Sequence, residues 1–294
     1  MNKALIISII SKEYRILLDD GRTVKAILSG KMRLNNYPVV GDYVFYQEID
    51  GLFVIQDILP RRNYMVRPNL ANVDQMIIMM SLKDPDFSYE LVNRLIILIE
   101  NSDIEPIICI SKADLGSTKE INEIRQFYES MNYRVYSCQK DFDVNFFEPL
   151  LKDKISVLCG QSGVGKSTLL NNLNPELNLR TNEISRALNR GKHTTRHVEL
   201  YHMFGGYLAD TPGFSSIDLS NLDKDSIAAH LTAFKPFLNQ CYFNNCLHLN
   251  EPNCAIKQAV EENKIQEAFY KTYVDVMNFI IEGNFKANRH RTLK

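Results

Sequence analysis

The sequence ISVLCGQSGVGKSTLLNNL, residues 155–173, decides the fold class of the chain. It begins with an apolar stretch typical of a buried strand, continues through a glycine-rich loop and ends in a stretch typical of a helix. Residues 160–167 match the pattern G-x-x-x-x-G-K-[ST] at every position. Glycines let backbone N–H groups turn toward phosphate oxygens, and the helix N-terminus adds a partial positive charge. We therefore predict a phosphate loop in an α/β fold, and with it a binding site for a nucleoside triphosphate.

The residue types of this loop predict individual roles. Lys166 should reach the β- and γ-phosphates, and the hydroxyl of Ser167 should coordinate Mg²⁺. The other loop residues expected to contact the nucleotide are Gly160, Gln161, Ser162, Gly163, Val164, Gly165 and Thr168. A chance glycine-rich turn is the alternative, and the strand before the loop and the helix after it argue against one.

Two segments downstream of the loop have the features of γ-phosphate sensors. The DTPG sequence at 210–213 follows a short strand, so Asp210 should hold Mg²⁺ through water and the Gly213 N–H should meet the γ-phosphate. The polar segment 189–197 lies between the two motifs and contains Thr194 and Thr195. A threonine hydroxyl there could complete the Mg²⁺ shell, as in a switch loop, although a merely solvated loop is the alternative. The predicted Mg²⁺ ligands are Ser167, Thr195 and Asp210.

Guanine recognition is predicted upstream of the phosphate loop. No N-K-x-D motif follows the loop, but SKAD stands at 111–114, after the strand-like EPIICI. Asp114 can accept two N–H bonds from guanine, Lys112 would lie along the base, and Ser111 occupies the first position of the motif. A second strand, RVYS, ends at Ser137 and Cys138, which resemble a backbone contact to guanine O6. A Lys-x-Asp tripeptide also arises by chance. The position of this one at the carboxyl end of a strand favours a guanine-binding site, because ligands gather there in open α/β sheets.

The flanking regions predict further folded parts. Five short strands separated by turn signals suit a small barrel such as an OB-fold, although another small β-domain remains possible; they are expected at 4–10, 14–18, 23–28, 42–47 and 53–59. Residues 61–68 are interpreted as a linker. Alternating strands and helices from about residue 72 indicate a mostly parallel sheet. From about residue 222 the chain is expected to be helical, apart from a segment rich in cysteine and histidine.

That segment predicts a metal site. Three thiolates and one imidazole suit tetrahedral Zn²⁺ in a closed structural site with no open coordination position; the residues are Cys241, Cys246, His248 and Cys254. Three free thiols near a histidine are the alternative. The remaining cysteines follow apolar runs and are expected to be ordinary buried thiols; they are Cys109, Cys138 and Cys159.

Composition limits the partners. The chain has 294 residues, with 34 Lys and Arg against 35 Asp and Glu, so its net charge of −1 excludes a histone-like basic protein. Phosphate contacts would need local basic groups, for which the candidates are Lys31, Arg33, Arg61, Arg62, Arg190, Lys192, Arg289 and Arg291. No apolar run reaches the roughly 18 residues of a membrane span, and the apolar start lacks a cleavage site, so we expect a cytoplasmic protein without membrane contact.

The motif order resembles one family: the circularly permuted GTPases of small ribosomal subunit assembly, the ribosome small subunit-dependent GTPase A family. The residues that carry the resemblance are ANVDQ (71–75), SKAD (111–114), GQSGVGKSTLLNNL (160–173), GKHTT (191–195), DTPGF (210–214) and CYFNNCLHLNEPNCA (241–255). The resemblance implies an OB-fold barrel at 1–64, a circularly permuted P-loop GTPase domain at 65–221, and a mostly helical zinc-binding domain at 222–294. The family usually has Asn at the position of Ser111.

The resemblance also implies an activity: hydrolysis of GTP to GDP and phosphate, with Mg²⁺, stimulated by the small (30S) ribosomal subunit late in its maturation, with rRNA as a contact. Phe214 stands where Ras-like enzymes place a water-orienting glutamine. We therefore expect His193 to position water beside Lys166 and Thr195, with Arg196 ranked lower. The alternative is a nucleotide-gated RNA-binding assembly factor with incidental turnover. We expect the protein to be a monomer. A P-loop kinase is disfavoured by the DTPG motif.

Overall fold

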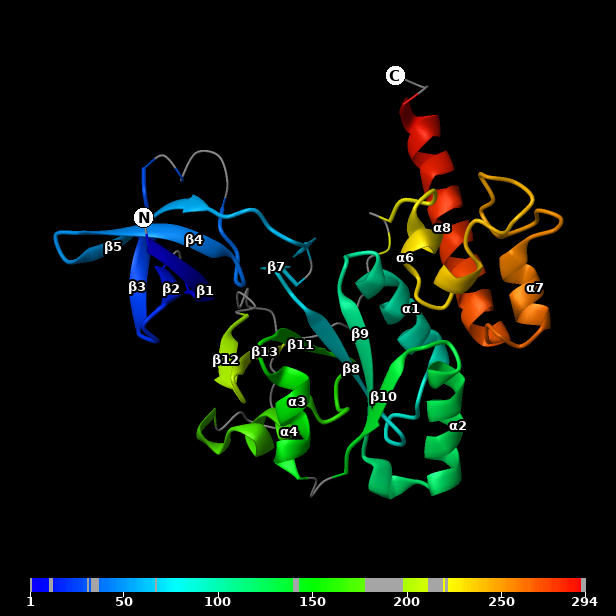
Figure 1. Ribbon diagram of the computed structural model, residues 1–294, viewed down its shortest axis with the longest axis horizontal. Coiled ribbons are helices and arrows are strands. Elements are labelled where there is room, and N and C mark those ends of the chain that lie inside the picture. Colours follow the sequence, from blue (N-terminus) through cyan, green and yellow to red (C-terminus); the bar gives the residue numbers. More distant parts are fainter. Residues whose placement is uncertain are drawn as a thin grey trace. The chain divides into compact units, whose positions relative to one another are not determined.

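The computed structural model describes residues 2–10, 13–30, 32, 37–66, 68–139, 143–177, 198–210, 219 and 222–291. The chain divides into two compact units. The first comprises Met1–Met76 and Phe142–Phe214, and the second comprises Ile77–Asp141 and Ser215–Lys294. Figure 1 traces the elements from the N-terminal barrel to the long C-terminal helix.

The N-terminal region is a closed five-stranded barrel, as the strand pattern predicts. Its strands are β1 (Asn2–Ile10), β2 (Glu13–Leu18), β3 (Thr23–Leu28), β4 (Tyr43–Ile49) and β5 (Leu52–Ile58), in the order β1-β2-β3-β5-β4. Pairing of β1 with β4 closes the barrel, and β3 pairs with β5 in parallel. Alternate residues point inward, and Ile6, Ile16 and Ile55 are fully buried in its core. This strand order is that of an OB-type barrel.

The described residues between the barrel and the sheet, 61–66 and 68–74, are fastened to the barrel, so the predicted linker is an ordered segment. Arg61 donates through Nε and Nη2 to the two carboxylate oxygens of the fully buried Asp42, at 2.7 and 2.8 Å. Arg62 donates to Asp74 at 2.7 Å. Two short strands lie between Arg62 and Asp74 in the sequence and pair with each other: β6 (Tyr64–Met65) and β7 (Leu70–Ala71).

These ion pairs involve two of the predicted phosphate contacts. Arg61 pairs with Asp42, which would otherwise be a buried unpaired charge, and Arg62 pairs with Asp74. Four further candidates, Lys31, Arg33, Arg190 and Lys192, lie outside the described residues, as do the side chains of Arg289 and Arg291.

A close backbone approach fixes the end of this segment on the barrel. Gly41 has a φ of +88°, and a Cβ there would lie 2.1 Å from the carbonyl oxygen of Ala71. The side-chain amide of Asn72 donates to the Gly41 carbonyl at 2.9 Å. Only glycine satisfies both the left-handed backbone and this contact.

A six-stranded sheet follows, with strand order β10-β9-β8-β11-β13-β12. Its strands are β8 (Gln75–Ser81), β9 (Glu105–Ser111), β10 (Arg134–Ser137), β11 (Ile155–Cys159), β12 (Leu200–Met203) and β13 (Gly206–Asp210). β9 and β10 are parallel, β11 and β13 are parallel, and β12 is antiparallel to β13. Every residue of β8 and β11 is buried, as expected of central strands covered on both faces.

The helices of this region are α1 (Tyr89–Glu100), α2 (Thr118–Glu129), α3 (Glu148–Leu151) and α4 (Lys166–Leu173). Ser88 caps α1 by accepting the Leu91 N–H, and Ser117 with Glu120 forms a capping box on α2. These caps explain why the two helices begin at Tyr89 and Thr118.

The C-terminal region differs from the expected helical run from residue 222. Only two short turns, α6 (Ile227–His230) and the 3₁₀ helix η5 (Lys235–Phe237), precede the cysteine and histidine segment in the described residues. The apolar periodicity from 255 to 281 belongs to two helices, α7 (Ala255–Glu261) and α8 (Glu267–Arg291). α8 packs on α1, where the buried Asn93 amide donates to the Ala268 carbonyl and to Thr272 Oγ1, both at 3.3 Å.

A buried carboxylate ties the same region to α1. Glu100 accepts the Tyr133 hydroxyl at 3.0 Å, the Thr232 N–H at 3.1 and 3.2 Å, and the Thr232 hydroxyl. Burial raises the pKa of Glu100, while these donors oppose the shift. Glu100 is only 6% exposed, so water could not readily replace its carboxylate as the acceptor for these donors.

Glu100→Ala should therefore lower the free energy of unfolding by roughly 1–3 kcal/mol, since it strands buried donors. Chemical denaturation measures the change. Glu105→Ala is the control, because Glu105 pairs with Arg134 while half exposed, and its loss should cost under about 1 kcal/mol. Equal losses in the two variants would contradict a structural role for the buried carboxylate.

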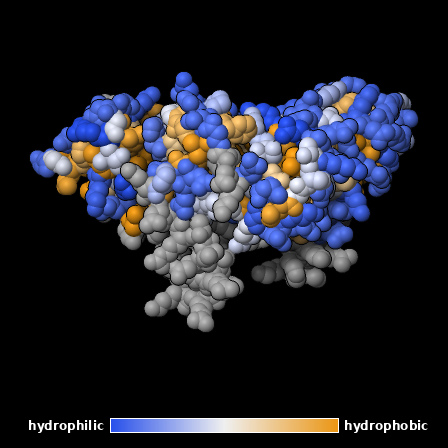
Figure 2. All heavy atoms as spheres, turned by 90° about the horizontal axis from the view of Figure 1, so that it is seen from below, coloured by the Kyte–Doolittle hydropathy of each residue, from blue (hydrophilic) through white to orange (hydrophobic). Residues whose placement is uncertain are grey.

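Among the described residues, no helix combines the length and apolar character needed to cross a membrane. Figure 2 shows one face on which hydrophobic residues form small separate patches among hydrophilic ones.

Candidate nucleotide and metal sites

The phosphate loop has the predicted strand-loop-helix form. β11 leads into a loop in which Gly160, Gly163 and Gly165 have φ values of +136°, +85° and +95°. A residue with a Cβ would be strained in these conformations, which explains the glycines. The loop ends at α4, and no side chain caps its N-terminus. The first N–H groups of α4 therefore have the arrangement that binds an anion.

Lys166 lies folded over this loop. Its ammonium group donates to the carbonyls of Gly160 at 2.8 Å and Gln161 at 2.7 Å. Burial lowers the pKa of Lys166, and the nearby Asp210 carboxylate opposes that shift. A cation held over the loop, beside the helix N-terminus, is suited to phosphate oxygens.

Asp210 is brought to the same end of the sheet. It is the last residue of β13, and its partner in the parallel pairing is Leu158, two residues before the loop begins. Ser167 lies in the first turn of α4. The structure thus brings Ser167, Lys166 and Asp210 to neighbouring elements. Four other predicted contacts, Thr194, Thr195, Gly213 and the catalytic candidate His193, lie outside the described residues, as do Arg196 and Phe214.

Two residues that sequence reasoning gave no role support the start of β11. The Asp74 carboxylate accepts the Ile155 N–H at 2.8 Å. The buried Gln75 amide donates to the Leu150 carbonyl at 2.6 Å and to Ser156 Oγ at 2.8 Å. Both belong to the ANVDQ segment, which therefore anchors the strand that presents the phosphate loop.

The two base-reading segments lie together in the second unit. β9 ends at Ser111, and Lys112 follows in the left-handed region with a φ of +50°. β10 runs parallel to β9 and ends at Ser137. The Cys138 N–H donates to the Ile110 carbonyl at 2.8 Å, and the Ala113 N–H donates to the Cys138 carbonyl at 3.2 Å.

This arrangement exposes the group that should read the base. Asp114 lies exposed in the 3₁₀ helix η2 (Ala113–Leu115). Ser111 is buried, with its carbonyl accepting the Leu82 N–H at 2.9 Å. The Lys112 ammonium donates to the Asp84 carbonyl. The end of β9 therefore presents a carboxylate and the stem of a lysine, as a guanine site requires.

The four predicted metal ligands form one cluster. The ligand atoms of Cys241, Cys246, His248 and Cys254 all lie within 4.8 Å of one another. His248 Nδ1 is 3.5 Å from Cys241 Sγ and 3.4 Å from Cys254 Sγ, and the two sulfurs are 3.9 Å apart. Tetrahedral Zn²⁺ with Zn–S bonds of about 2.3 Å needs separations of this size. The donor set and its geometry fit zinc.

Residues around the cluster hold the His248 loop in place. The Glu251 carboxylate accepts the N–H groups of Leu247 and Leu249 at 2.7 and 2.8 Å. The Tyr270 and Tyr273 hydroxyls donate to the carbonyls of His248 and Leu247, each at 2.8 Å. Without a metal, burial raises the pKa of the Cys246 thiol to about 12. Metal binding must then release protons from the cysteines.

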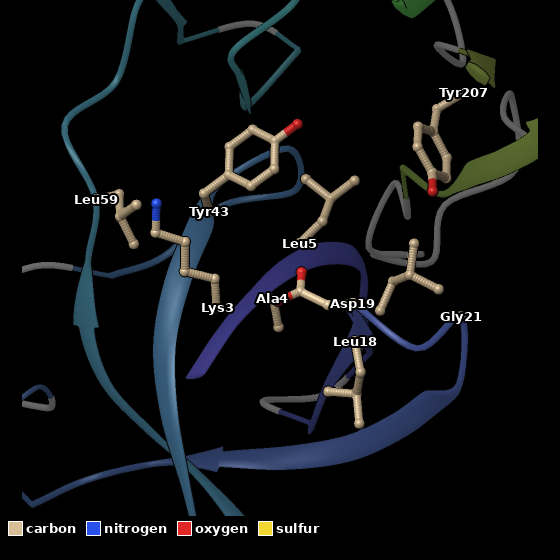
Figure 3. Close-up of a pocket in the computed structure, with 10 residues that line it drawn as sticks. Lys3, Ala4, Leu5, Leu18, Asp19, Gly21, Tyr43, Leu59 and Tyr207 are labelled. Atoms are coloured by element: carbon tan, nitrogen blue, oxygen red, sulfur yellow. The ribbon is translucent and has the colours of Figure 1, made fainter. Parts of the chain in front are cut away.

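A separate groove of about 590 Å³ opens on the barrel in the first unit. Figure 3 shows Tyr43 of β4 and Tyr207 of β13 on either side of Leu5, and Lys3 and Asp19 also line the groove. None of the residues assigned to nucleotide or metal lines this groove.

Comparison with known proteins agrees with this architecture. A family model described as RsgA GTPase matches residues 58–220. The chain is 43% identical over 284 residues to the "Small ribosomal subunit biogenesis GTPase RsgA 1" of Listeria monocytogenes, covering 94% of this chain and 97% of that one. The chain belongs to the RsgA GTPase family.

Other relatives agree with that assignment. The RsgA of Bacillus subtilis is 42% identical, with 95% of this chain and 98% of that one covered. The crystal structure of YloQ, a circularly permuted GTPase, matches with a TM-score of 0.81 and 35% identity over 96% of each chain. YjeQ from Thermotoga maritima matches with a TM-score of 0.81 and 32% identity, over 95% of this chain and 98% of that one. A second family model, described as 50S ribosome-binding GTPase, matches residues 155–291.

Family membership confirms several sequence predictions. The chain is a GTP hydrolase with a circularly permuted GTPase fold, an N-terminal OB-like barrel and C-terminal helices with a Cys₃His cluster. The permutation explains why SKAD precedes the phosphate loop, since moving the chain ends changes connectivity and leaves the site intact.

Proposed function

We propose that the chain is a GTP-driven switch that the small ribosomal subunit stimulates and that acts late in 30S maturation. The observation that carries the proposal is the phosphate loop with Lys166 over it and Asp210 at the neighbouring strand end. The relatives are named small ribosomal subunit biogenesis GTPases, which supports the choice of partner. Such factors work where subunits are assembled, so we place the protein in the cytoplasm.

We assign the roles as follows. Lys166 binds the β- and γ-phosphates, the glycine-rich loop and Thr168 surround them, and Ser167, Thr195 and Asp210 hold Mg²⁺. Mg²⁺ neutralises charge on the phosphate oxygens when it is bound. Asp114, Lys112 and the segment Ser137–Cys138 read guanine, with Ser111 beside them; the Cys138 N–H and carbonyl are bonded to β9 and Ala113. Thr194 and Gly213 contact the γ-phosphate side. Water attacks the γ-phosphorus, and GDP and phosphate leave.

We further propose one structural Zn²⁺ held by Cys241, Cys246, His248 and Cys254, whose geometry supports it. The proposed domain limits are 1–64 for the barrel, 65–221 for the GTPase and 222–294 for the zinc-binding region. The protein is proposed to act as a monomer on the subunit and its rRNA.

Asp114→Asn should weaken GTP binding tenfold or more, because a charge-assisted bond worth about 1.5–3 kcal/mol is lost. Xanthosine triphosphate should bind better to the variant than to the wild type, because xanthine carries a carbonyl oxygen at C2 where guanine carries an amino group, and the side-chain amide introduced by Asp114→Asn can donate to that oxygen. Competition binding with a fluorescent GDP analogue measures both changes. Asp86→Asn, on the loop before α1, is the control. Unchanged GTP affinity in Asp114→Asn would mean that SKAD does not read the base.

His193→Ala should lower the GTPase rate and leave nucleotide affinity almost unchanged. Phe214 cannot orient water, so the rate should depend on another polar group. Single-turnover hydrolysis and GDP binding separate the two effects. A wild-type rate in the variant, both alone and with 30S subunits, would remove the catalytic role of His193.

The decisive test of the function is the GTPase rate against 30S concentration, with 50S subunits as control and at two salt concentrations. We expect stimulation by 30S alone, tighter binding with a non-hydrolysable GTP analogue than with GDP, and weaker binding at high salt. Nucleotide-dependent 30S binding without stimulation would favour a nucleotide-gated RNA-binding assembly factor with incidental turnover. Equal stimulation by both subunits, or by neither, would contradict the proposal.

A further inference from the structure

Two cysteine thiols meet beneath the base-reading turn. Cys109 lies within β9 and Cys138 directly follows β10. Their sulfur atoms are 3.5 Å apart, with one thiol donating to the other. Both side chains are buried, Cys109 at 1% and Cys138 at 7% exposure. This contact is separate from the Cys₃His cluster, whose cysteines all lie in the C-terminal region.

The backbone around Cys138 connects this thiol to the base-reading turn. Its N–H is bonded to Ile110 of β9, and its carbonyl accepts the N–H of Ala113. Asp114 follows Ala113 in the same 3₁₀ turn. A single hydrogen bond, from the Ala113 N–H to the Cys138 carbonyl, therefore connects Cys138 to the turn that carries Asp114, the carboxylate proposed to read guanine.

The two thiols are chemically unequal. A hydrogen bond from the Cys109 thiol stabilises the Cys138 thiolate and lowers the pKa of Cys138. Donating that bond, together with burial, raises the pKa of Cys109. Cys138 is also the more exposed of the two. It is therefore the thiol that an oxidant meets first, and Cys109 stands ready to resolve the product.

We propose that Cys109 and Cys138 form a redox-sensitive pair that a hydroperoxide converts to a disulfide, with loss of affinity for guanine nucleotides. The inference rests on the proposed function in one respect: Cys138 is taken to line the guanine site. Disulfides in proteins of reducing compartments are usually transient and regulatory, which suits a reversible device.

The oxidation proceeds in two steps. The Cys138 thiolate attacks the terminal oxygen of the hydroperoxide, so an S–O bond forms, the O–O bond breaks, and the leaving oxygen departs as water or alcohol after protonation. Cys109, losing its proton, then attacks the Cys138 sulfur; the S–S bond forms, the S–O bond breaks and water leaves. Two thiols are oxidised by two electrons, and one hydroperoxide is reduced.

The geometry explains the loss of affinity. An S–S bond of about 2.05 Å requires the sulfurs to approach by about 1.5 Å from their contact distance. The bond draws Cys138 toward β9 and shifts the turn that holds Asp114. Displacements of about 1 Å at a binding site can cost a hundredfold in activity. Bound GDP should cover Cys138 and slow the oxidation.

The test uses the full-length, zinc-loaded protein in its reduced state. Nucleotide-free protein is titrated with hydrogen peroxide, and differential alkylation with peptide mass spectrometry maps each cysteine. We expect a Cys109–Cys138 disulfide that forms more slowly with GDP bound and that dithiothreitol reverses. Cys159 is the matched control thiol: it is fully buried at the end of β11, where burial raises its pKa to about 12, and it should stay reduced.

Nucleotide affinity completes the test. Binding of a fluorescent GDP analogue should weaken at least about tenfold on oxidation and recover on reduction. Cys109→Ser, with Cys109→Ala as a second variant, should keep its affinity under the same treatment. Absence of the disulfide, or a disulfide with unchanged affinity, would overturn the inference. Equal loss in Cys109→Ser would show that oxidation of Cys138 alone is responsible, and would also overturn it.

The two proposals fail separately. Disulfide formation is measured without nucleotide, so it does not depend on the guanine site. If reduced Asp114→Asn binds GTP like the wild type, the base-reading assignment fails, whatever the state of the cysteines.

Discussion

Replacing Lys166 by alanine should abolish measurable GTP hydrolysis. The ammonium group lies over the phosphate loop, held by the carbonyls of Gly160 and Gln161, and no other side chain of the loop carries a positive charge. When nucleotide binds, the phosphate oxygens replace these carbonyls as partners. The cation then stabilises charge that develops during transfer, and a single such group is worth about 10²–10³ in rate. The Lys166 ammonium group also contacts the phosphates of bound GTP before the reaction, so the affinity for GTP should fall as well.

Single-turnover hydrolysis at saturating GTP measures this loss. Lys152→Ala is the matched control, since Lys152 is exposed on the turn before β11 and should leave the rate within about threefold. Unfolding midpoints of both variants check that the fold is intact. A Lys166→Ala protein that hydrolyses GTP at the control rate would exclude this loop as the hydrolytic site.

The phosphate loop and the barrel could be predicted because their patterns are local. The glycines at 160, 163 and 165 fill positions whose backbone conformations require them, and a strand or helix on each side is encoded in neighbouring residues. The barrel strands alternate in burial, as in β2, and their turns carry Gly21 and Gly51 at positive φ. Each of these signals acts within a few residues.

The parts that could not be predicted depend on distant partners. Arg61 and Arg62 look like solvated linker residues until the fold brings Asp42 and Asp74 to them. β12 has four residues, and only its pairing with β13 makes it a strand. The role of Gln75 depends on Leu150 and Ser156, far along the chain.

One missed feature did have a local signal. The break between α7 and α8 is a Schellman ending, in which Asn263 takes a φ of +56° and the Lys264 N–H donates to the Ala259 carbonyl at 2.8 Å. Asparagine is the residue, after glycine, that favours this position. The apolar period continues through the break, which conceals it.

The metal site gives the second large effect. Cys246→Ala should remove zinc from the protein and loosen the segment from 241 to 254. In the described part of this segment, regular helices and strands are absent, so the ligand bonds and the contacts of Glu251, Tyr270 and Tyr273 must hold it. Structural zinc contributes about 10–16 kcal/mol of apparent binding free energy in zinc-finger peptides, which is folding free energy for the segment.

Metal analysis and limited proteolysis measure the two consequences. The wild type should carry one zinc per chain and resist cleavage within 241–254, whereas Cys246→Ala should carry none and be cut there. Tyr242→Ala is the matched control: Tyr242 neighbours a ligand, is 74% exposed and offers no ligand atom, so it should keep its zinc. GDP affinity should change little, because β9 and β10 carry none of the four ligands. Zinc-free wild-type protein, or full zinc in Cys246→Ala, would exclude the four-residue site. A closed set of four protein ligands leaves the metal no position for substrate. Loss of the zinc should therefore disturb the fold of this segment before it changes the rate of GTP hydrolysis.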